Sequence, residues 1–448
     1  MSNLILRNAQ LVLDSGIIRG EVAVEDGVIT EVGPAISEVS AMDLDVCGAF
    51  VFPGFIDAHV HFNEPGREQW EGLSTGSAAL AAGGGTTFFD MPLNSDPPVL
   101  NADEFHRKRK LAEEKSLLDF ALWGGLCPGQ TDAIDGMAEA GAVGFKAFLC
   151  DSGIAEFPAT DAATLRAGMT RAKRWNLPVA VHAESPEVLA GVVRNTTDTS
   201  MRAFLDSRPK EAEVAAIRMA CEIAGETGAA LHVVHVSCAE GLAEIDHARK
   251  SGVDVSAETC PHYLLFNTDD AIRIGARAKC APPLREKEDV AALWKSLLAG
   301  QVDTIGSDHS PAPLELKNGE DFFQIWGGIS GCQHAFPAFL GELRRRAPKQ
   351  FAKAAGWLAA NPASRFGFGK RKGRIAVGYD ADFALVDFRK AAPIEGKTLL
   401  TKHPLSLYES HHSGCHVIDV VRRGKFLVQR GEITQPTTRG IFLRPTHE

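Results

Sequence analysis

Eight short apolar segments alternate with helical stretches through the middle of this 448-residue chain. Each segment is apolar enough to be buried on both faces, which is typical of strands in a parallel sheet. The segments are Phe55–His61, Thr86–Met91, Asp119–Gly124, Val143–Phe148, Pro178–Ala183, Ala230–Val236, Val253–Glu258 and Val302–Ser307. Stretches such as STGSAALAAGG, ADEFHRKRKLAEEKSL, AATLRAGMTRAKRWN and EAEVAAIRMACEIAGETG lie between them. This alternation predicts an α/β fold, a TIM-like (β/α)8 barrel. An open doubly wound sheet is the alternative, but no GxGxxG follows the first strand.

The two ends of the chain have a different pattern, of short strands and turns. LILRNAQLVL and GEVAVEDGVITEVG lie near the start, and DADFALVDF and HVIDVVRRGKFLVQRGEI lie near the end. Neither end has enough apolar surface to be stable alone, so we expect them to pair into one small β-sandwich domain. The predicted division is 1–52 plus 366–448 for this small domain and 53–365 for the barrel.

Residues able to bind metal ions stand at or near the carboxyl ends of five predicted strands. They are His59, His61, Lys146, His182, His235 and Asp308. Enzymes with this barrel place their chemistry on that face, where ligands from different strands can converge on a metal ion. The pattern predicts a metal-dependent hydrolase.

The histidines differ in how strongly each indicates a ligand. His59 and His61 are two residues apart, so on a strand both imidazoles point to one side. A lone HxH pair is more often a core or surface feature, and the further candidates on other strands favour metal binding here. His232 lies three residues before His235, so it should face the opposite side and be structural. For His262 two interpretations stay open: a residue of the substrate pocket or a histidine of the core.

Lys146 and Asp308 suggest the chemistry. A charged lysine in an apolar strand is costly, and burial lowers its pKa and makes the amine nucleophilic. Reaction with carbon dioxide would give an N6-carboxylysine whose two oxygens can bridge two metal ions. The alternative is a lysine whose amine extends to the barrel mouth. Asp308 could bind metal and also be catalytic, taking a proton from water and delivering it to a leaving nitrogen.

Composition limits the class of protein. Hydrophobic residues make up 45% of the chain and charged residues 23%, so neither disorder nor a membrane protein is indicated. We expect no signal peptide, no membrane span and a cytoplasmic location, with the nine cysteines as free thiols. The net charge of −10 argues against nucleic acid as a partner and leaves a small-molecule substrate. The basic runs 107–110 and 344–346 have acidic neighbours and should be solvated helix faces.

These residues, in this order, resemble the amidohydrolase superfamily, in particular its cyclic-amide branch of hydantoinases, dihydroorotases and allantoinases. The resemblance covers nearly the whole chain, including PGFIDAHVHF, SDHSP, NPASRFGF and KGRIAVGYDADFALVD. It implies a barrel with two divalent metal ions and a Lys146 carboxylated by carbon dioxide or bicarbonate. Zinc is the default metal, with manganese, cobalt or iron as alternatives. A homotetramer or dimer is also implied.

Within that branch, several local segments are similar to allantoinases. They are HFNEPGREQWEG, FFDMPLNSDPP, GFKAFLCDSGIAEFP, KCAPPLR and WGGISG. Asn63 stands where dihydroorotases carry an arginine for the substrate carboxylate, and allantoin has no carboxylate. The resemblance implies ring opening of allantoin to allantoate by a hydroxide that bridges the metal ions, a step of purine catabolism. Asn63, Asn94, Ser330 and Gly331 are candidate substrate contacts.

Two alternatives stay open at this point. One is a hydantoinase or dihydropyrimidinase-type cyclic amidase, with the same chemistry on another ring. The other is a non-catalytic scaffold, because this superfamily fold also occurs in proteins that lack the metal ligands. The segment Glu409–His412 departs from the expected pattern after Tyr408, which concerns a local surface or subunit contact.

Overall fold

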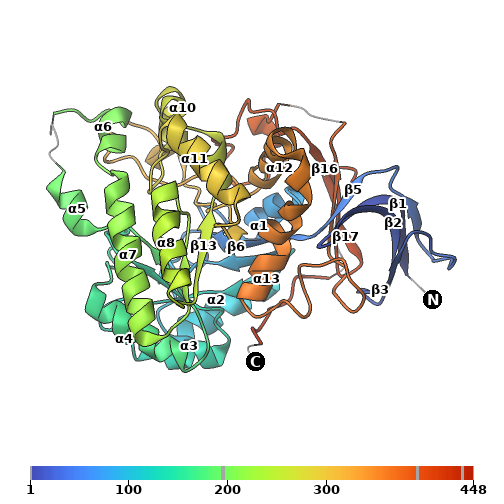
Figure 1. Cartoon of the computed structure of the whole chain (residues 1–448), viewed down its shortest axis with the longest axis horizontal. Coiled ribbons are helices and arrows are strands. Elements are labelled where there is room, and N and C mark those ends of the chain that lie inside the picture. Colours follow the sequence, from blue (N-terminus) through green and yellow to red (C-terminus); the bar gives the residue numbers. More distant parts are fainter. Residues whose placement is uncertain (1–2, 193–196, 390–392, 435–437, 447–448) are drawn as a thin grey trace.

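The computed structural model describes residues 3–192, 197–389, 393–434 and 438–446. Parallel strands from the middle of the chain lie inside a layer of helices, and an antiparallel sheet made from both ends stands to one side (Figure 1). Within the described residues, no helix has the length and apolar character needed to cross a membrane.

The parallel strands follow one another in chain order. Their bounds are β6 (Phe55–Val60), β7 (Gly85–Asp90), β8 (Asp119–Leu122), β9 (Gly124–Gly125), β10 (Phe145–Phe148), β11 (Val179–His182), β12 (Leu231–Val233), β13 (Val255–Thr259) and β14 (Thr304–Ile305). β6, β7 and β8 pair in that order, and β9 to β14 pair in a second run. Every strand segment predicted from the apolar pattern overlaps one of these strands.

Backbone hydrogen bonds join the two runs of strands at both seams. Val143 N, just before β10, donates to Leu122 O at the end of β8, over 2.9 Å. His61 N, just after β6, donates to His309 O beyond β14, over 2.8 Å. The last strand therefore lies alongside the first, as in a (β/α)8 barrel.

Long helices cover the outside of the strands. They are α1 (Leu73–Ala82), α2 (Ala102–Lys115), α3 (Ala133–Ala140), α4 (Ala162–Lys173), α7 (Lys210–Thr227), α8 (Ala239–Lys250), α11 (Lys287–Leu298) and α12 (Ala335–Arg346). The helical stretches predicted from the sequence lie in α1, α2, α4 and α7. α2 begins where the Asn101 side chain accepts a hydrogen bond from Glu104 N, over 3.0 Å. α7 ends at Gly228, whose φ of 64° suits a residue without a side chain.

Shorter helices occupy the loops. They are α5 (Pro186–Gly191), α6 (Met201–Asp206), α9 (Pro261–Leu265), α10 (Thr268–Ile274), α13 (Asn361–Arg365), η1 (Gly275–Ala278), η2 (Leu314–Leu316), η3 (Pro348–Lys353), η4 (Gly356–Ala360) and η5 (Gly396–Thr398). The loops after β10, β11 and β14, which carry some of these turns, surround the cavity described below.

The second sheet joins the two ends of the chain, and its strand pairs are antiparallel except for two parallel pairs near its centre. Its strands are β1 (Leu4–Leu13), β2 (Gly16–Glu25), β3 (Val28–Gly33), β4 (Asp43–Asp45), β5 (Phe50–Pro53), β15 (Phe383–Asp387), β16 (His416–Arg422), β17 (Lys425–Gln429) and β18 (Glu432–Ile433). The order is β18-β17-β16-β15-β5-β1-β2-β3, with β4 beside β1. The antiparallel pair β5–β15 brings the early and late segments together, as the sequence predicted. The exact domain boundaries stay a prediction.

A cluster of buried aromatic and aliphatic side chains from several barrel strands fills the barrel interior. The Phe366 ring, which follows α13, lies 5.4 Å from the Phe89 ring and 5.2 Å from the Trp123 ring, between centroids. The Trp123 indole donates to Ala58 O over 3.1 Å, one residue before His59. This packing supports the strand end that carries the HxH pair.

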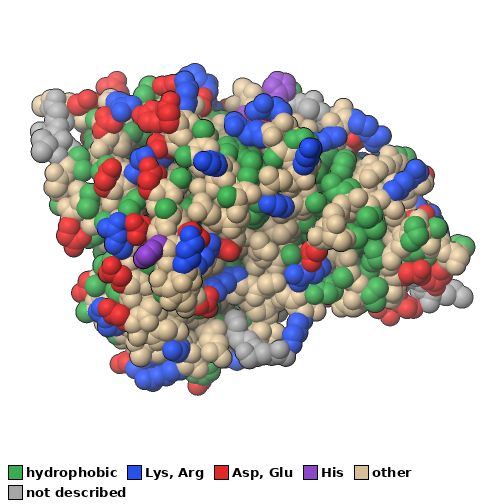
Figure 2. All heavy atoms as spheres, in the orientation of Figure 1, with side chains coloured by type: hydrophobic (Ala, Val, Ile, Leu, Met, Phe, Trp, Pro, Cys, Tyr) green, Lys and Arg blue, Asp and Glu red, His purple; other side chains and the backbone are tan. Residues whose placement is uncertain are grey.

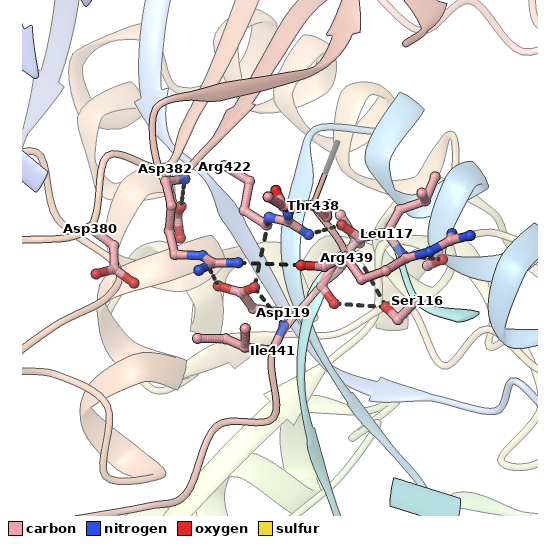
Figure 3. Close-up of polar contacts among 12 residues, drawn as sticks. Ser116, Leu117, Asp119, Asp380, Asp382, Arg422, Thr438, Arg439 and Ile441 are labelled. Atoms are coloured by element: carbon pink, nitrogen blue, oxygen red, sulfur yellow. Dashed lines mark hydrogen bonds and ion pairs between the residues drawn. The ribbon is translucent and has the colours of Figure 1, made fainter. Parts of the chain in front are cut away.

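A buried cluster of charges fixes the sheet to the barrel. Lys372 Nζ lies 2.7 Å from Asp119 Oδ2 on β8, 2.7 Å from Asp382 Oδ2 and 3.0 Å from Asp380 Oδ2. Asp119 also accepts a hydrogen bond from Ile441 N near the end of the chain, over 3.0 Å. Figure 3 shows Asp119, Asp382 and Ile441 converging from separate segments. Buried charges are tolerated when they are paired in this way.

Acidic and basic side chains are interspersed over the helical face of the molecule (Figure 2). The two basic runs follow this arrangement. In α2, Arg109 pairs with Glu113 over 2.9 Å, and in α12, Arg345 pairs with Glu342 over 2.5 Å. The run 344–346 is therefore a solvated helix face, as the sequence predicted. In the run 107–110 the prediction is wrong for Lys108, which is fully buried: its amine lies 3.0 Å from Asp90 Oδ2 and donates to Met91 O over 2.9 Å.

Candidate metal centre

His59, His61 and Asp308 meet at one end of the barrel. Asp308 Oδ1 lies 3.2 Å from His59 Nε2 and 3.4 Å from His61 Nε2. All three residues are buried, and one ligand atom from each lies within 4.8 Å of the others. Both imidazoles of the HxH pair face the same side, as strand alternation predicted. The three side chains form a group with the donors and spacing of a metal site.

His182 and His235 form a second group beside the first. His182 ends β11 and His235 lies two residues beyond β12, and their Nδ1 and Nε2 atoms are 3.0 Å apart. The His235 ring lies 5.5 Å from the His59 ring, between centroids. The structure thus brings together residues that are 176 positions apart in the chain, from His59 to His235.

Lys146, on β10, is fully buried between these groups. Its amine has no hydrogen-bond partner among the described residues and lies 5.0 Å from the centre of the Phe148 ring. Burial lowers the pKa of Lys146 to about 8, although Asp308 and Glu258 oppose the shift. A buried amine with a lowered pKa is more often neutral and nucleophilic. This environment suits reaction with carbon dioxide.

The chemistry of these side chains fits divalent cations. Burial lowers the pKa of His61, His182 and His235, which favours the neutral imidazole that binds a metal. Nitrogen and carboxylate oxygen donors suit zinc and also manganese, cobalt or iron.

Two buried glutamates, which the sequence analysis did not single out, hold the outer nitrogens of two of these histidines. Glu258 Oε1 lies 2.7 Å from His59 Nδ1, and Glu184 Oε2 lies 2.8 Å from His182 Nε2. A carboxylate behind a ligand histidine fixes its tautomer and aims the other nitrogen at the metal. The sequence carries a weak indication, because Glu258 ends an apolar strand and Glu184 lies two residues after His182.

A cavity of about 1050 Å³ opens onto both groups of histidines. The loop after β10 (151–153), the segment 324–328 and single residues from other loops form its walls. Arg208 and Lys279 bring two cationic side chains to the lining. The Lys279 amine lies 4.6 Å from the centre of the Phe204 ring, and burial lowers the pKa of Lys279 to about 8. The cavity is large enough for a small cyclic amide and its substituent.

The four predicted substrate contacts occupy different places. Asn94 lines the cavity and its amide donates to Ser310 Oγ over 3.3 Å. Ser310 also lines the cavity; the sequence analysis missed it, although it lies in SDHSP. Asn63, Ser330 and Gly331 are not among the described lining residues, and the buried Asn63 amide has no partner within the described chain. All four roles stay predictions.

The remaining histidines of the sequence analysis lie apart from this cavity. The His232 ring bonds to Ser256 Oγ over 2.8 Å, which is a structural contact. His262 is fully buried and is not among the described residues that line the cavity. The departing segment after Tyr408 includes Glu409, which forms an ion pair with Arg277.

Comparisons with known proteins agree on one family for this chain. The profile of the amidohydrolase family matches residues 50–427. The chain is 46% identical to the allantoinase of Solibacter usitatus, over 99% of this chain and 97% of that protein. It is 48% identical to the allantoinase of Deinococcus radiodurans, over 99% of each chain.

Solved structures similar to this chain include hydantoinases and dihydropyrimidinases. The L-hydantoinase (dihydropyrimidinase) from Arthrobacter aurescens superposes with a TM-score of 0.93 at 31% identity, covering 99% of both chains. The dihydropyrimidinase from Brevibacillus agri has a TM-score of 0.90 at 28% identity, covering 100% of this chain and 99% of its own.

Proposed function

The chain belongs to the amidohydrolase family, and from that premise we propose that it is an allantoinase, a metal-dependent hydrolase that opens the hydantoin ring of allantoin to give allantoate. The convergence of His59, His61, His182, His235 and Asp308 at one cavity carries the proposal of metal-dependent hydrolysis. The choice of allantoin rests on the full-length similarity to allantoinases. The same convergence argues against a non-catalytic scaffold.

We propose that the two groups of histidines hold two divalent ions, with zinc as the default metal. His59, His61 and Asp308 would hold one ion and His182 and His235 the other, with carboxylated Lys146 shared by both. Such ions, when bound, lower the pKa of water and polarise a substrate carbonyl. The neutral imidazoles and the buried amine with a lowered pKa support this assignment.

Asp308 would move the proton of the reaction. Water adds to a ring amide carbonyl, and the carbon–nitrogen bond of the ring breaks to leave a carboxylic acid, which releases its remaining proton to solvent and becomes a carboxylate. Asp308 accepts the proton that water loses and returns it to the departing ring nitrogen, so that the charges balance. Its position beside His59 and His61, at the cavity surface, supports this role.

Allantoin is neutral and carries a ureido group that needs polar partners. We propose that Asn94 donates to this substrate from the cavity wall, with Ser310 beside it. Asn63, Ser330 and Gly331 are retained as candidate contacts for a substrate that draws the surrounding loops closer. Since Asn63 replaces the arginine of dihydroorotases, dihydroorotate should be a poor substrate.

A hydantoinase or dihydropyrimidinase-type activity is the second candidate. The structural likeness to an L-hydantoinase and a dihydropyrimidinase favours it, since those proteins share this fold along nearly the whole chain. Their sequence identities of 31% and 28% are lower than the 46% and 48% of the allantoinases, which is why we place allantoin first.

A panel of cyclic amides distinguishes these candidates. The protein is reconstituted with zinc, manganese or cobalt plus bicarbonate, and ring opening of allantoin, dihydroorotate, dihydrouracil and a 5-alkyl hydantoin is followed. We expect the highest kcat/KM for allantoin, and loss of turnover in Asp308→Asn. A large preference for the alkyl hydantoin or dihydrouracil would favour the second candidate. Lys279 and Arg208 also line the cavity and could pair with a substrate carboxylate. Efficient hydrolysis of dihydroorotate would therefore contradict the argument that Asn63 excludes this substrate.

We also propose a cytoplasmic location and a homotetramer or dimer. All nine cysteines are unpaired in the described structure and eight of them are buried, which suits a reducing compartment. The oligomeric state can be measured by light scattering on the purified protein, and a monomer at working concentration would contradict this part of the proposal.

A further inference from the structure

The two glutamates behind the histidines differ in what neutralises them. The Arg208 guanidinium holds Glu184 with a two-pronged contact: Nε donates to Oε1 over 3.0 Å and Nη2 donates to Oε2 over 2.6 Å. Glu184 is fully buried, so this ion pair is shielded from water. Glu184 Oε2 therefore contacts both the His182 ring and the Arg208 guanidinium.

Glu258 has no such cation. Its Oε1 accepts from His59, while its Oε2 has no hydrogen-bond partner among the residues the structure describes. His232 Nε2 lies 3.7 Å from Oε2, beyond hydrogen-bond distance, and burial lowers the pKa of His232. Glu258 is thus a fully buried carboxylate whose main hydrogen-bond partner is the His59 ring.

This difference changes the two histidines as ligands. A carboxylate that accepts the outer N–H of an imidazole raises the basicity of the other nitrogen. A carboxylate already paired with a guanidinium attracts that proton less strongly, because part of its charge is neutralised. The His59 group also contains the Asp308 carboxylate. The carboxylate that lies with His182 is Glu184, which is already paired with Arg208.

We infer that the carboxylates behind the histidines make the two metal positions unequal: the position at His59, His61 and Asp308 binds its ion more tightly, and Arg208 weakens the position at His182 and His235. This inference rests on the two-metal site of the proposed function. It assigns positioning roles to Glu184, Glu258 and Arg208, none of which needs to touch the substrate.

Arg208 is itself held in place from behind. Its backbone oxygen accepts a hydrogen bond from Arg285 Nη1 over 2.6 Å, and Arg285 Nη2 pairs with Glu213 Oε2 over 2.9 Å. Arg285 and Glu213 are both buried. The contact between Arg208 and Glu184 is therefore part of a fixed network, and its effect on His182 should be constant.

Metal titration tests the inference without any substrate. The metal-free protein is equilibrated with zinc at a series of buffered free concentrations in the presence of bicarbonate, and the zinc bound per chain is measured. We expect two binding steps whose dissociation constants differ by about tenfold or more. A single step with two equal ions would overturn the inference.

Matched variants assign each step. Glu258→Gln should weaken the tighter step by about 10- to 100-fold, and Glu184→Gln should weaken the looser step by a similar factor. Arg208→Met should tighten the looser step and bring the two closer, while Arg208→Lys, which keeps the cation, should preserve the separation. Arg218→Met, which removes an exposed partner of Glu244, is the control and should change neither step.

The outcomes separate this inference from the proposed function. Equal weakening of both steps by Glu184→Gln and Glu258→Gln would sink the inference even if allantoin is hydrolysed. Two unequal steps with the expected shifts would support it even if allantoin is not the substrate. Binding of one ion or none by the folded protein would overturn both the two-metal site and this inference, and a circular dichroism spectrum confirms that each variant is folded.

Discussion

The Lys372 ammonium pairs with three buried carboxylates between the sheet and the barrel, those of Asp119, Asp380 and Asp382. The substitution Lys372→Met removes this ammonium. Lys372 is 1% exposed, so methionine fills a similar apolar space without the charge. Without it, Asp119 keeps an Arg423 contact at 3.2 Å and Asp380 keeps Arg371 at 2.9 Å. Among the described residues, the Asp382 side chain then keeps only a hydrogen bond from the Arg423 backbone, at 2.8 Å. The variant therefore leaves one buried carboxylate without a cation.

The expected loss is large because the site is buried. Removing one partner of a buried ion pair costs about 3–5 kcal/mol, a large share of a typical unfolding free energy of about 5–15 kcal/mol. Lys250→Met is the matched control, since the Lys250 side chain is 74% exposed and pairs with Asp246. An exposed pair of this kind contributes about 1 kcal/mol or less.

The loss should depend on pH in a defined direction. Burial raises the pKa of Asp382 in the folded protein, and Lys372 partly opposes the shift. Without Lys372 the folded pKa rises further above the unfolded value, so the folded state binds a proton that the unfolded state has released. Stability is then lost as pH rises through this interval, and the deficit of Lys372→Met should be larger at about pH 8 than at about pH 5.5.

Urea unfolding followed by circular dichroism measures these differences, from the shift of the midpoint at constant slope. The double variant Lys372→Met/Asp382→Asn removes the unpaired charge and should recover part of the lost stability. If Lys372→Met stays within about 1 kcal/mol of the parent, or if the added Asp382→Asn recovers nothing, the reasoning from buried charge is refuted.

Three further substitutions test the proposed chemistry. Lys146→Arg cannot form the carbamate and should lose activity together with metal, measured by elemental analysis; full activity with full metal content would contradict the bridging role. Asn94→Ala should lower kcat/KM for allantoin by about 5- to 150-fold with unchanged metal content, the effect of one lost buried hydrogen bond, and unchanged kinetics would remove Asn94 from the substrate contacts. Asp308→Asn should lower kcat by at least about 100-fold, as for loss of an acid–base group, and near-normal turnover would exclude Asp308 as the proton carrier.

The barrel and the histidine pair were predictable from local patterns. A strand buried on both faces needs an apolar residue at nearly every position, and this requirement is visible in segments such as Val179–His182 without knowledge of their neighbours. The spacing of His59 and His61 makes them face one side for the same local reason. A buried lysine such as Lys146 stands out within an apolar run.

The surroundings of the site were not predictable in this way. Asn63 and Asn94 look alike as candidates in the sequence, yet only Asn94 of this pair lines the described cavity. Glu184 could be noticed beside His182, but its partner Arg208 lies on another segment and nothing local links the two. Such contacts depend on how loops from different strands are arranged over the barrel end.

By itself, the sequence determined the order of strands and helices and the placing of the candidate ligand residues at the strand ends, because periodicity and burial act over a few neighbouring residues. Only the tertiary structure decided which carboxylate stands behind which histidine and how Lys372 joins Asp119 to Asp382. These pairings bring together groups up to 253 positions apart. Their geometry is set by the closure of the barrel and the docking of the sheet, which no short stretch of sequence encodes.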